Sequence, residues 1–239
     1  MIYQITSRQN DKIKELVKLS DTKFSKEMGL FKIEGFHALE MAVKAKVVKS
    51  VFLLKEDKEL PKEIDQYIVS KEIMEKISET KNPQGAVVVC EYLKSSQKFD
   101  DKVLYLDGVS DPGNLGTILR TAVAFGYNDI ILSNGCVSQY NDKVLQASQG
   151  AIFKLNIVKN FDLSKLNGYQ ILATEIKGSV DLDEIKPNKK HVLVLGNEAH
   201  GVSESILKLA DKRIRIDIEN IESLNVAIAG AIAMYKLSR

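Results

Sequence analysis

Three segments of the chain combine glycine with polar side chains directly after an apolar run of strand length. The first runs from Asp107 to Gly116, the second from Leu195 to Val202, and the third from Ile214 to Val226. Each leads into a helical pattern of apolar residues. In open parallel α/β sheets, ligands bind outside the carboxyl ends of the strands. We therefore expect these loops to form a ligand site.

The first loop carries two glycines, a candidate helix cap and an arginine. Gly113 and Gly116 permit close approach of the backbone to a ligand. Asn114 has the residue type of a helix N-cap, and Arg120 follows six residues later. The loop alone is also compatible with a capped helix that bears a surface arginine, because such loops serve as plain turns too.

The second and third loops supply further polar groups. Glu198 is placed to accept hydrogen bonds or to orient a base. His200 has the side chain of an acid–base catalyst, although a lone loop histidine is more often incidental. A helix is expected to begin near Ser223, and small residues that allow close helix packing line one side of it: Ala227, Ala229, Gly230, Ala231 and Ala233.

The chain around these loops alternates between strand and helix patterns. In the C-terminal part we expect helices at 115–125, 203–210 and 224–237 and buried strands at 103–107, 129–132, 169–174, 191–195 and 214–218. This alternation predicts a mainly parallel sheet with helices on its faces. The N-terminal part reads as a small α/β domain, with helices at 11–19, 36–43 and 71–78 and strands at 30–33, 48–54, 67–69 and 85–91.

The polar stretch 94–101 lies between two strand-like runs and is the best linker candidate. We therefore expect a domain at 1–93, a linker at 94–101 and a second domain at 102–239 that holds all three loops.

Several classes of protein are disfavoured by what the sequence lacks. It has no Walker phosphate loop and no G-x-G-x-x-G after a strand, which argues against a conventional dinucleotide site. It has no H-E-x-x-H and no Cys/His cluster, so we expect no metal site. No apolar run approaches a membrane span, and no signal peptide is expected. The two cysteines, Cys90 and Cys136, are far apart, which favours a reducing compartment and hence a cytoplasmic location.

Charge gives weak support for a nucleic-acid partner. The formal net charge is only +2, but residues 1–50 hold ten Lys/Arg against six Asp/Glu. Contacts to phosphate need such cations. The alternative is a solvated helix face, because Asp11, Glu15 and Asp21 lie among the lysines.

Taken together, the loops resemble the SpoU/TrmH family of SPOUT RNA methyltransferases. The first motif is Asn114-Leu115-Gly116 with Arg120-Thr121-Ala122 and Phe125-Gly126, the second is Leu195-Gly196-Asn197-Glu198 with Gly201, and the third is Glu222-Ser223-Leu224-Asn225-Val226. The resemblance extends to Ser148, Gly150 and Ala151, and Phe31-Lys32-Ile33-Glu34-Gly35 is similar to the family's substrate-binding domain. One departure is Asp217, where many relatives have proline; this removes a rigid φ.

The resemblance implies a fold, a cofactor and an assembly. The C-terminal domain would form a deep trefoil knot, a rare feature in proteins, and the N-terminal domain would be an L30e-like RNA-binding domain. The enzyme would be a metal-free homodimer that binds S-adenosylmethionine (S-adenosyl-L-methionine). The residues implied to hold the cofactor are Thr174, Leu195, Gly196, Asn197, Gly201, Ile216, Ser223, Leu224 and Asn225.

The implied reaction transfers a methyl group to a ribose 2′-hydroxyl of RNA. The resemblance places Arg120 beside the ribose in a base-like role, with Asn114, Glu198, Ser223 and Asn225 orienting it. Arginine is normally fully protonated. Two roles therefore stay open: Arg120 is driven by its site to act as a base, or it binds the adjacent phosphate and another acceptor takes the proton.

The N-terminal domain resembles that of members that modify ribosomal RNA, so we expect rRNA of the 23S type as the substrate. Three alternatives stay open. The first is a transfer RNA 2′-O-methyltransferase. The second is an RNA-binding relative without catalysis, and the third is a different nucleotide-using α/β enzyme such as an oxidoreductase.

Overall fold

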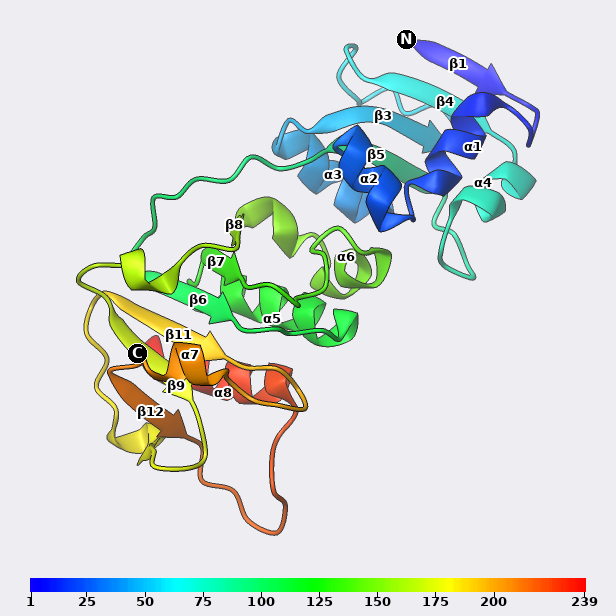
Figure 1. Cartoon of the computed structure of the whole chain (residues 1–239). Helices are drawn as coiled ribbons and strands as arrows, with labels where there is room; N and C mark the ends of the chain where they lie inside the picture. Colours follow the sequence, from blue (N-terminus) through cyan, green and yellow to red (C-terminus); the bar gives the residue numbers. More distant parts are fainter. The chain divides into compact units, whose positions relative to one another are not determined.

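The computed structural model describes residues 1–239 and divides into two compact units (Figure 1). The first consists of residues 1–93 and 140–153, and the second of residues 94–139 and 154–239. The first unit's long segment ends where the sequence predicts the linker to begin. The segment 140–153 groups with the first unit, although the sequence-based domain limits, which stay a prediction, place it in the second.

The first unit is built on a mixed five-stranded sheet in the order β1-β4-β3-β5-β2. Strands β1, β4 and β3 run parallel, whereas β5 is antiparallel to both β3 and β2. The strands are β1 (Ile2–Ile5), β2 (Leu30–Glu34), β3 (Val48–Leu53), β4 (Asp65–Val69) and β5 (Ala86–Glu91). The helices are α1 (Asp11–Lys18), α2 (Thr22–Met28), α3 (Phe36–Lys44), α4 (Lys71–Ile77) and α6 (Asp142–Ser148), and a short 3-10 turn, Ala151–Lys154, follows α6.

Local sequence signals explain the ends of several of these helices. Asn10, Asp21 and Ser70 cap α1, α2 and α4 with side-chain oxygens that accept backbone N–H bonds. Gly29 ends α2 in the left-handed conformation, at φ +64°, which glycine adopts without steric cost. The apolar faces of α1 and α4 then pack with strand residues in one buried core, which includes Ile13, Leu16, Ile73 and Ile77.

The second unit is built on a seven-stranded sheet in which every pairing is parallel, in the order β10-β12-β9-β11-β6-β7-β8. The strands are β6 (Lys102–Leu106), β7 (Asp129–Leu132), β8 (Asn156–Lys159), β9 (Gln170–Thr174), β10 (Val180–Asp181), β11 (His191–Leu195) and β12 (Lys212–Arg215). The helices are α5 (Pro112–Phe125), α7 (Glu204–Leu207) and α8 (Val226–Leu237), with short 3-10 turns at Leu163–Lys165 and Leu182–Glu184.

Strand β11 lies at the centre of this sheet, between β9 and β6, and all five of its residues are buried. Burial on both faces explains its continuous apolar run. Val192 and Val194 belong to a core that includes Ile206 and Leu207 of α7. On the alternate positions, Leu195 lies under Gly230 of α8, because a Cβ added to Gly230 would come within 2.6 Å of Leu195 Cδ1.

The prediction of an α/β protein with a parallel C-terminal sheet is confirmed, but several element limits are wrong. The last strand covers Lys212–Arg215 rather than 214–218, and α7 is shorter than the predicted helix at 203–210. The sequence patterns also missed five elements: β1, α2, α6, β8 and β10. These are short, at two to seven residues, so they offer little periodicity to detect.

The small residues of α8 allow close packing, as predicted, and the helix they meet is α5 of the same chain. Ala227, Gly230 and Ala233 are buried within the chain, where α8 packs against α5 and β11. The exposed face of α8 is instead formed by large side chains, Ile228, Ile232 and Tyr235. None of the helices is both long and apolar enough to cross a membrane.

Candidate active site

The three glycine-containing loops follow strands of the same parallel sheet. Leu195 at the end of β11 is in register with Leu106 at the end of β6, and Ile214 of β12 is in register with Thr174 of β9. Because these strands run parallel, the loops after β6, β11 and β12 leave the same edge of the sheet. This is the position at which ligands bind in such folds.

Glu198 joins the second loop to the first. Its carboxylate accepts the backbone N–H of Ser110 at 3.2 Å, the backbone N–H of Asp111 at 3.1 Å and the amide Nδ2 of Asn114 at 3.1 Å. The Ser110 hydroxyl also donates to it at 3.2 Å. Burial raises the pKa of Glu198, but the bonds from Asn114 and from these backbone groups outweigh burial and leave its pKa below the ordinary value.

Asn225 joins the third loop to the first. Its amide Nδ2 donates to Asn114 Oδ1 at 2.8 Å. Its own Oδ1 accepts the backbone N–H groups of Ala227 at 2.9 Å and Ile228 at 3.3 Å, so Asn225 is the N-cap of α8. Asn114 therefore lies between Glu198 and Asn225, and one chain of hydrogen bonds ties the three loops together.

The prediction that Asn114 caps α5 is wrong. Asp111 is the N-cap, since its Oδ1 accepts the backbone N–H of Asn114 at 2.7 Å, and Pro112 occupies the first turn. Proline suits that position because its missing N–H would be unpaired there anyway. An acidic residue followed by proline was the sequence signal that could have identified this cap. Its effect is to leave the Asn114 side chain available for Glu198 and Asn225.

Asn197 shapes the second loop. Its backbone exchanges two hydrogen bonds of 2.9 Å with Gly201, and its Nδ2 donates to the Gly108 carbonyl at 2.7 Å. The chain passes so close to itself here that a Cβ on Gly196 would lie 2.2 Å from the Gly201 carbonyl carbon. Only glycine fits at position 196 without moving the loop.

A cavity of about 540 Å³ opens beside these loops, within the second unit. This volume is in the range of small-molecule sites. Apolar side chains such as Ile214, Ile216 and Leu224 form part of its wall. Polar groups form the rest, so the cavity suits a ligand with both an apolar ring system and charged groups.

Most of the residues that the sequence predicted for cofactor and substrate line this cavity. They are Thr174, Gly196, Asn197, Glu198, Gly201, Ile216, Ser223, Leu224 and Asn225. Leu195 is not among them, because its side chain is 1% exposed and packs beneath Gly230. Asn114 does not line the cavity either, but it is hydrogen-bonded to Glu198 and Asn225, which do.

Arg120 lies on the solvent side of α5, outside the cavity wall. Its guanidinium makes no hydrogen bond or ion pair within the chain. All five of its N–H donors therefore remain available to an anionic partner.

Two charged lining residues, Glu175 and Arg215, were not among the predicted site residues. Glu175 follows Thr174 directly, and Arg215 lies within the third loop, next to Ile216. Arg215 donates to Asp217 Oδ1 at 2.8 Å and to the Ser179 carbonyl at 2.6 Å. Asp217 thus forms an ion pair with Arg215 within its loop.

The residues expected to be bystanders have ordinary surroundings. The His200 side chain is exposed at the cavity wall, while its backbone N–H donates to Asn197 Oδ1. Cys90 and Cys136 are free thiols, and burial raises the pKa of each. A raised pKa disfavours the nucleophilic thiolate.

Comparison with known proteins matches two family models to the two parts of the chain. Residues 101–235 match the SpoU rRNA Methylase family, and residues 10–88 match the MRM3-like substrate binding domain. The chain is similar to the 23S rRNA (guanosine(2553)-2'-O)-methyltransferase RlmP of Bacillus subtilis, with 32% identity over 98% of each protein. It is also 32% identical to a tRNA/rRNA methyltransferase of Synechocystis that is described as uncharacterized, over 100% of this chain and 94% of that protein.

A solved structure shows the same fold. The AdoMet-bound rRNA methyltransferase from Sinorhizobium meliloti superposes with a TM-score of 0.90 at 27% identity, covering 99% of this chain and 97% of that one. The similarity therefore spans both units.

Proposed function

The chain belongs to the SpoU rRNA methylase family, and we propose from this membership how its residues divide the work of an RNA 2′-O-ribose methyltransferase. The enzyme uses S-adenosylmethionine and methylates ribosomal RNA. The single observation that carries the assignment of roles is the hydrogen-bonded chain Glu198–Asn114–Asn225, which joins all three motif loops at the cavity wall.

The cavity of about 540 Å³ fits the cofactor. Its apolar wall suits an adenine ring and its polar groups suit the amino-acid part. Gly196 leaves room for close backbone approach, because the loop there admits no Cβ. We assign adenosine and methionine binding to the backbone near Thr174, Gly196, Ile216 and Leu224. When bound, the cofactor supplies an electrophilic methyl group.

Arg120 is assigned to the RNA side of the reaction. It is exposed and unpaired within the chain, so it is free to meet a ribose and its adjacent phosphate. Asn114, Glu198, Ser223 and Asn225 orient the ribose beside the cavity. Positioning of this kind supplies much of the acceleration in a displacement reaction.

Transfer of tritiated methyl groups to 23S rRNA tests these roles. Arg120→Ala should lose activity by about a hundredfold or more, since a positioned proton acceptor contributes about that much. Arg120→Lys separates the two roles: a phosphate-binding role should be partly rescued by lysine, whereas a base-like role should not. Full activity in both variants contradicts the assignment.

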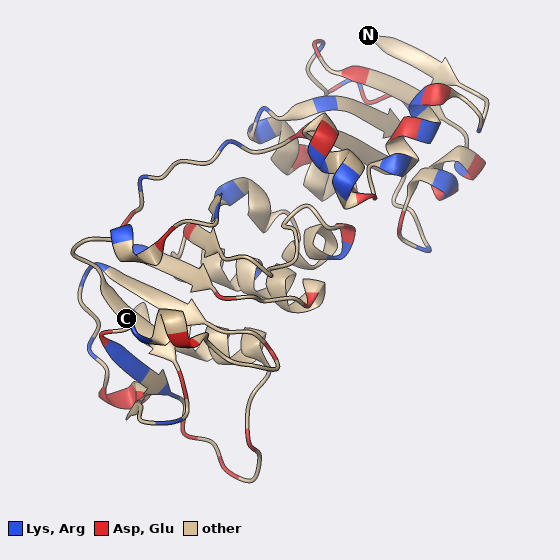
Figure 2. Ribbon diagram, viewed as in Figure 1, with Lys and Arg blue, Asp and Glu red and all other residues tan.

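We place the target in 23S-type rRNA, because the relative RlmP that matches the whole chain acts there. Mass spectrometry of rRNA from cells with and without the gene identifies the methylated nucleotide. The N-terminal unit is assigned to RNA selection from its match to a substrate-binding domain. Its helices carry both basic and acidic residues (Figure 2), so shape and individual hydrogen bonds, rather than a uniform positive surface, would provide selectivity.

The proposal also covers the detailed fold of each unit, the assembly and the cellular location. We assign a trefoil knot to the C-terminal unit and an L30e-like fold to the N-terminal one, on the family resemblance. We assign a homodimer, supported by Ile228, Ile232 and Tyr235, which form an exposed apolar stripe at helical spacing on α8. Two free thiols agree with a cytoplasmic location.

A further inference from the structure

A second cavity, of about 300 Å³, lies entirely within the first unit. Its charged wall is formed by Lys32, Glu34, Glu79 and Asp142. The volume is at the lower end of the range for small-ligand sites. None of the roles assigned above uses this cavity.

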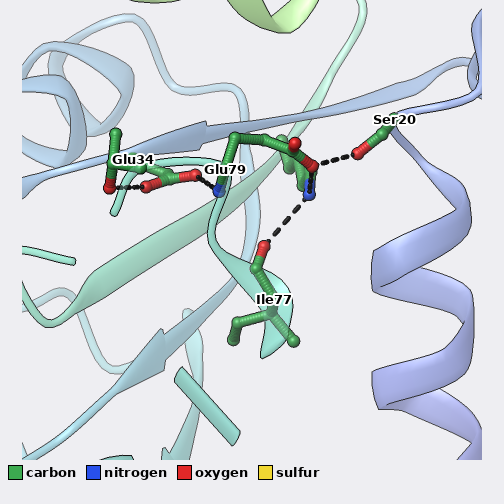
Figure 3. Close-up of polar contacts among 6 residues, drawn as sticks. Ser20, Glu34, Ile77 and Glu79 are labelled. Carbon is green, nitrogen blue, oxygen red and sulfur yellow. Dashed lines mark hydrogen bonds and ion pairs between the residues drawn. The ribbon is translucent and has the colours of Figure 1, made fainter. Parts of the chain in front are cut away.

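Two of its carboxylates, Glu34 and Glu79, form hydrogen bonds that hold the turn after α4 (Figure 3). Glu79 Oε1 accepts from Lys32 Nζ at 2.7 Å and from the Ser20 hydroxyl at 2.6 Å. Glu34 accepts the backbone N–H of Glu79 and the Thr80 hydroxyl, the latter at 2.8 Å. These bonds hold the wall together and occupy Glu79 Oε1 and both oxygens of Glu34.

Lys32 is the buried cation of this wall. Its side chain is 2% exposed, and Nζ donates to the Ile77 carbonyl at 3.0 Å as well as to Glu79. An ammonium group has three donors. Two of these have partners, so the third N–H of Lys32, a residue that lines the cavity, has no hydrogen-bond partner within the chain.

Asp142 is the third carboxylate of this wall. It is the first residue of α6, it is partly buried at the cavity wall, and it forms no ion pair. Burial raises its pKa, and attraction by Lys32 and a hydrogen bond with Ser20 only partly oppose this. A desolvated carboxylate of this kind gains most from a ligand that donates hydrogen bonds.

We infer that this cavity binds an unpaired guanine base of the RNA, an inference that rests on the proposed function. Asp142 accepts the adjacent N1–H and N2–H donors of the base, and the free N–H of Lys32 donates to O6. Guanine is the base whose pairing edge offers two adjacent donors beside an acceptor, which matches one carboxylate beside one ammonium. Unpaired bases are the usual targets of sequence-specific RNA recognition.

Two further features select a base over other ligands. Three carboxylates against one lysine repel a phosphate, and the structure holds no cluster of His, Cys, Asp or Glu arranged for a metal ion. Phe36 does not line the cavity itself, but it is 51% exposed and stands in the chain between the lining residues Gly35 and His37. An exposed aromatic ring is a stacking surface for an unstacked base.

Fluorescence anisotropy with the full chain tests the inference. The probes are short fluorescein-labelled oligouridylates whose central residue is guanosine, inosine or uridine. Inosine lacks the N2 amino group. The guanosine oligonucleotide should bind about tenfold more tightly than either of the others, the effect of one charged hydrogen bond, and Asp142→Asn should abolish this preference.

The chain contains a closely matched control. Asn10-Asp11-Lys12 opens α1 as Asn141-Asp142-Lys143 opens α6, and Asp11 lies outside the cavity. Asp11→Asn removes the same charge from the same helix position and should keep the guanosine preference.

Equal binding of the guanosine and inosine probes by the wild-type chain overturns the inference, and so does a preference that survives Asp142→Asn. If Asp142→Asn fails to fold, as judged by thermal unfolding, the wild-type probe series alone decides. The assay contains no S-adenosylmethionine, so a chain that binds guanosine selectively but transfers no methyl group contradicts the proposed function and leaves this inference standing.

Discussion

At the scale of single residues, the site depends on Glu198 more than on any other polar group, because five donors meet at its carboxylate. Glu198→Gln preserves the shape but turns an amide NH2 toward groups that themselves donate. Leaving one such donor unpaired costs about 1–3 kcal/mol. We expect kcat/KM for methyl transfer to fall by about tenfold or more, whereas Glu204→Gln, an exposed change in the same unit, should leave it unchanged.

The same substitution has a signature in the pH dependence of stability. The folded chain lowers the pKa of Glu198 below its ordinary value of 4.5. Stability from this group is therefore present above that value and is lost as pH falls through the lowered pKa. Urea unfolding of wild type and Glu198→Gln should show a difference in midpoint that is largest above 4.5 and narrows below it. A constant difference across this range would contradict the role given to the carboxylate.

At the scale of elements, α8 is held at its start by a residue that also serves the site. Asn225 caps the helix and donates to Asn114. Asn225→Ala should lower the free energy of unfolding by about 1 kcal/mol and also reduce methyl transfer. Asn10→Ala removes an equivalent cap from α1 in the other unit. It should cost similar stability with no loss of activity when both are measured by urea unfolding and methyl transfer.

The elements that could be predicted from the sequence are those with long or fully buried patterns. Strands β7 and β11 were predicted to the residue, because their apolar runs end at clear polar boundaries. Strand β12 was misplaced, because Ile214, Ile216 and Ile218 continue an alternating pattern after the pairing with β9 has ended at Ile214. Periodicity shows which side chains are apolar. The end of a strand depends instead on where its pairing with the neighbouring strand stops.

The candidate site likewise has features that could be predicted from the sequence and features that could not. The motif residues were found because their types and order are distinctive. The hydrogen bonds among Glu198, Asn114 and Asn225 join residues about 84 to 111 positions apart in the chain, and local patterns carry no such information. The cavity of the first unit was missed for this reason as well. Lys32 and Asp142 lie on its wall only because α6, from the middle of the chain, packs beside β2.

At the scale of the whole molecule, the exposed side of α8 gives the proposed homodimer a testable surface. Ile228, Ile232 and Tyr235 are 52%, 39% and 43% exposed and recur at helical spacing. An isologous interface presents the same stripe from both subunits, so Ile232→Asp places two unpaired carboxylates in it. We expect sedimentation equilibrium to show a monomer for this variant and a dimer for wild type.

Met28→Asp is the control for that change, because Met28 is a comparably exposed apolar residue, 43% exposed, on α2 of the other unit. It should remain a dimer. Ile232 does not line the cavity assigned to the cofactor. A loss of activity in Ile232→Asp would therefore come from loss of the dimer and not from a change in the cavity wall. An Ile232→Asp chain that stays folded, becomes monomeric and still transfers methyl groups at the wild-type rate would show that one subunit contains a complete site. A dimer that survives Ile232→Asp would place the interface elsewhere than α8.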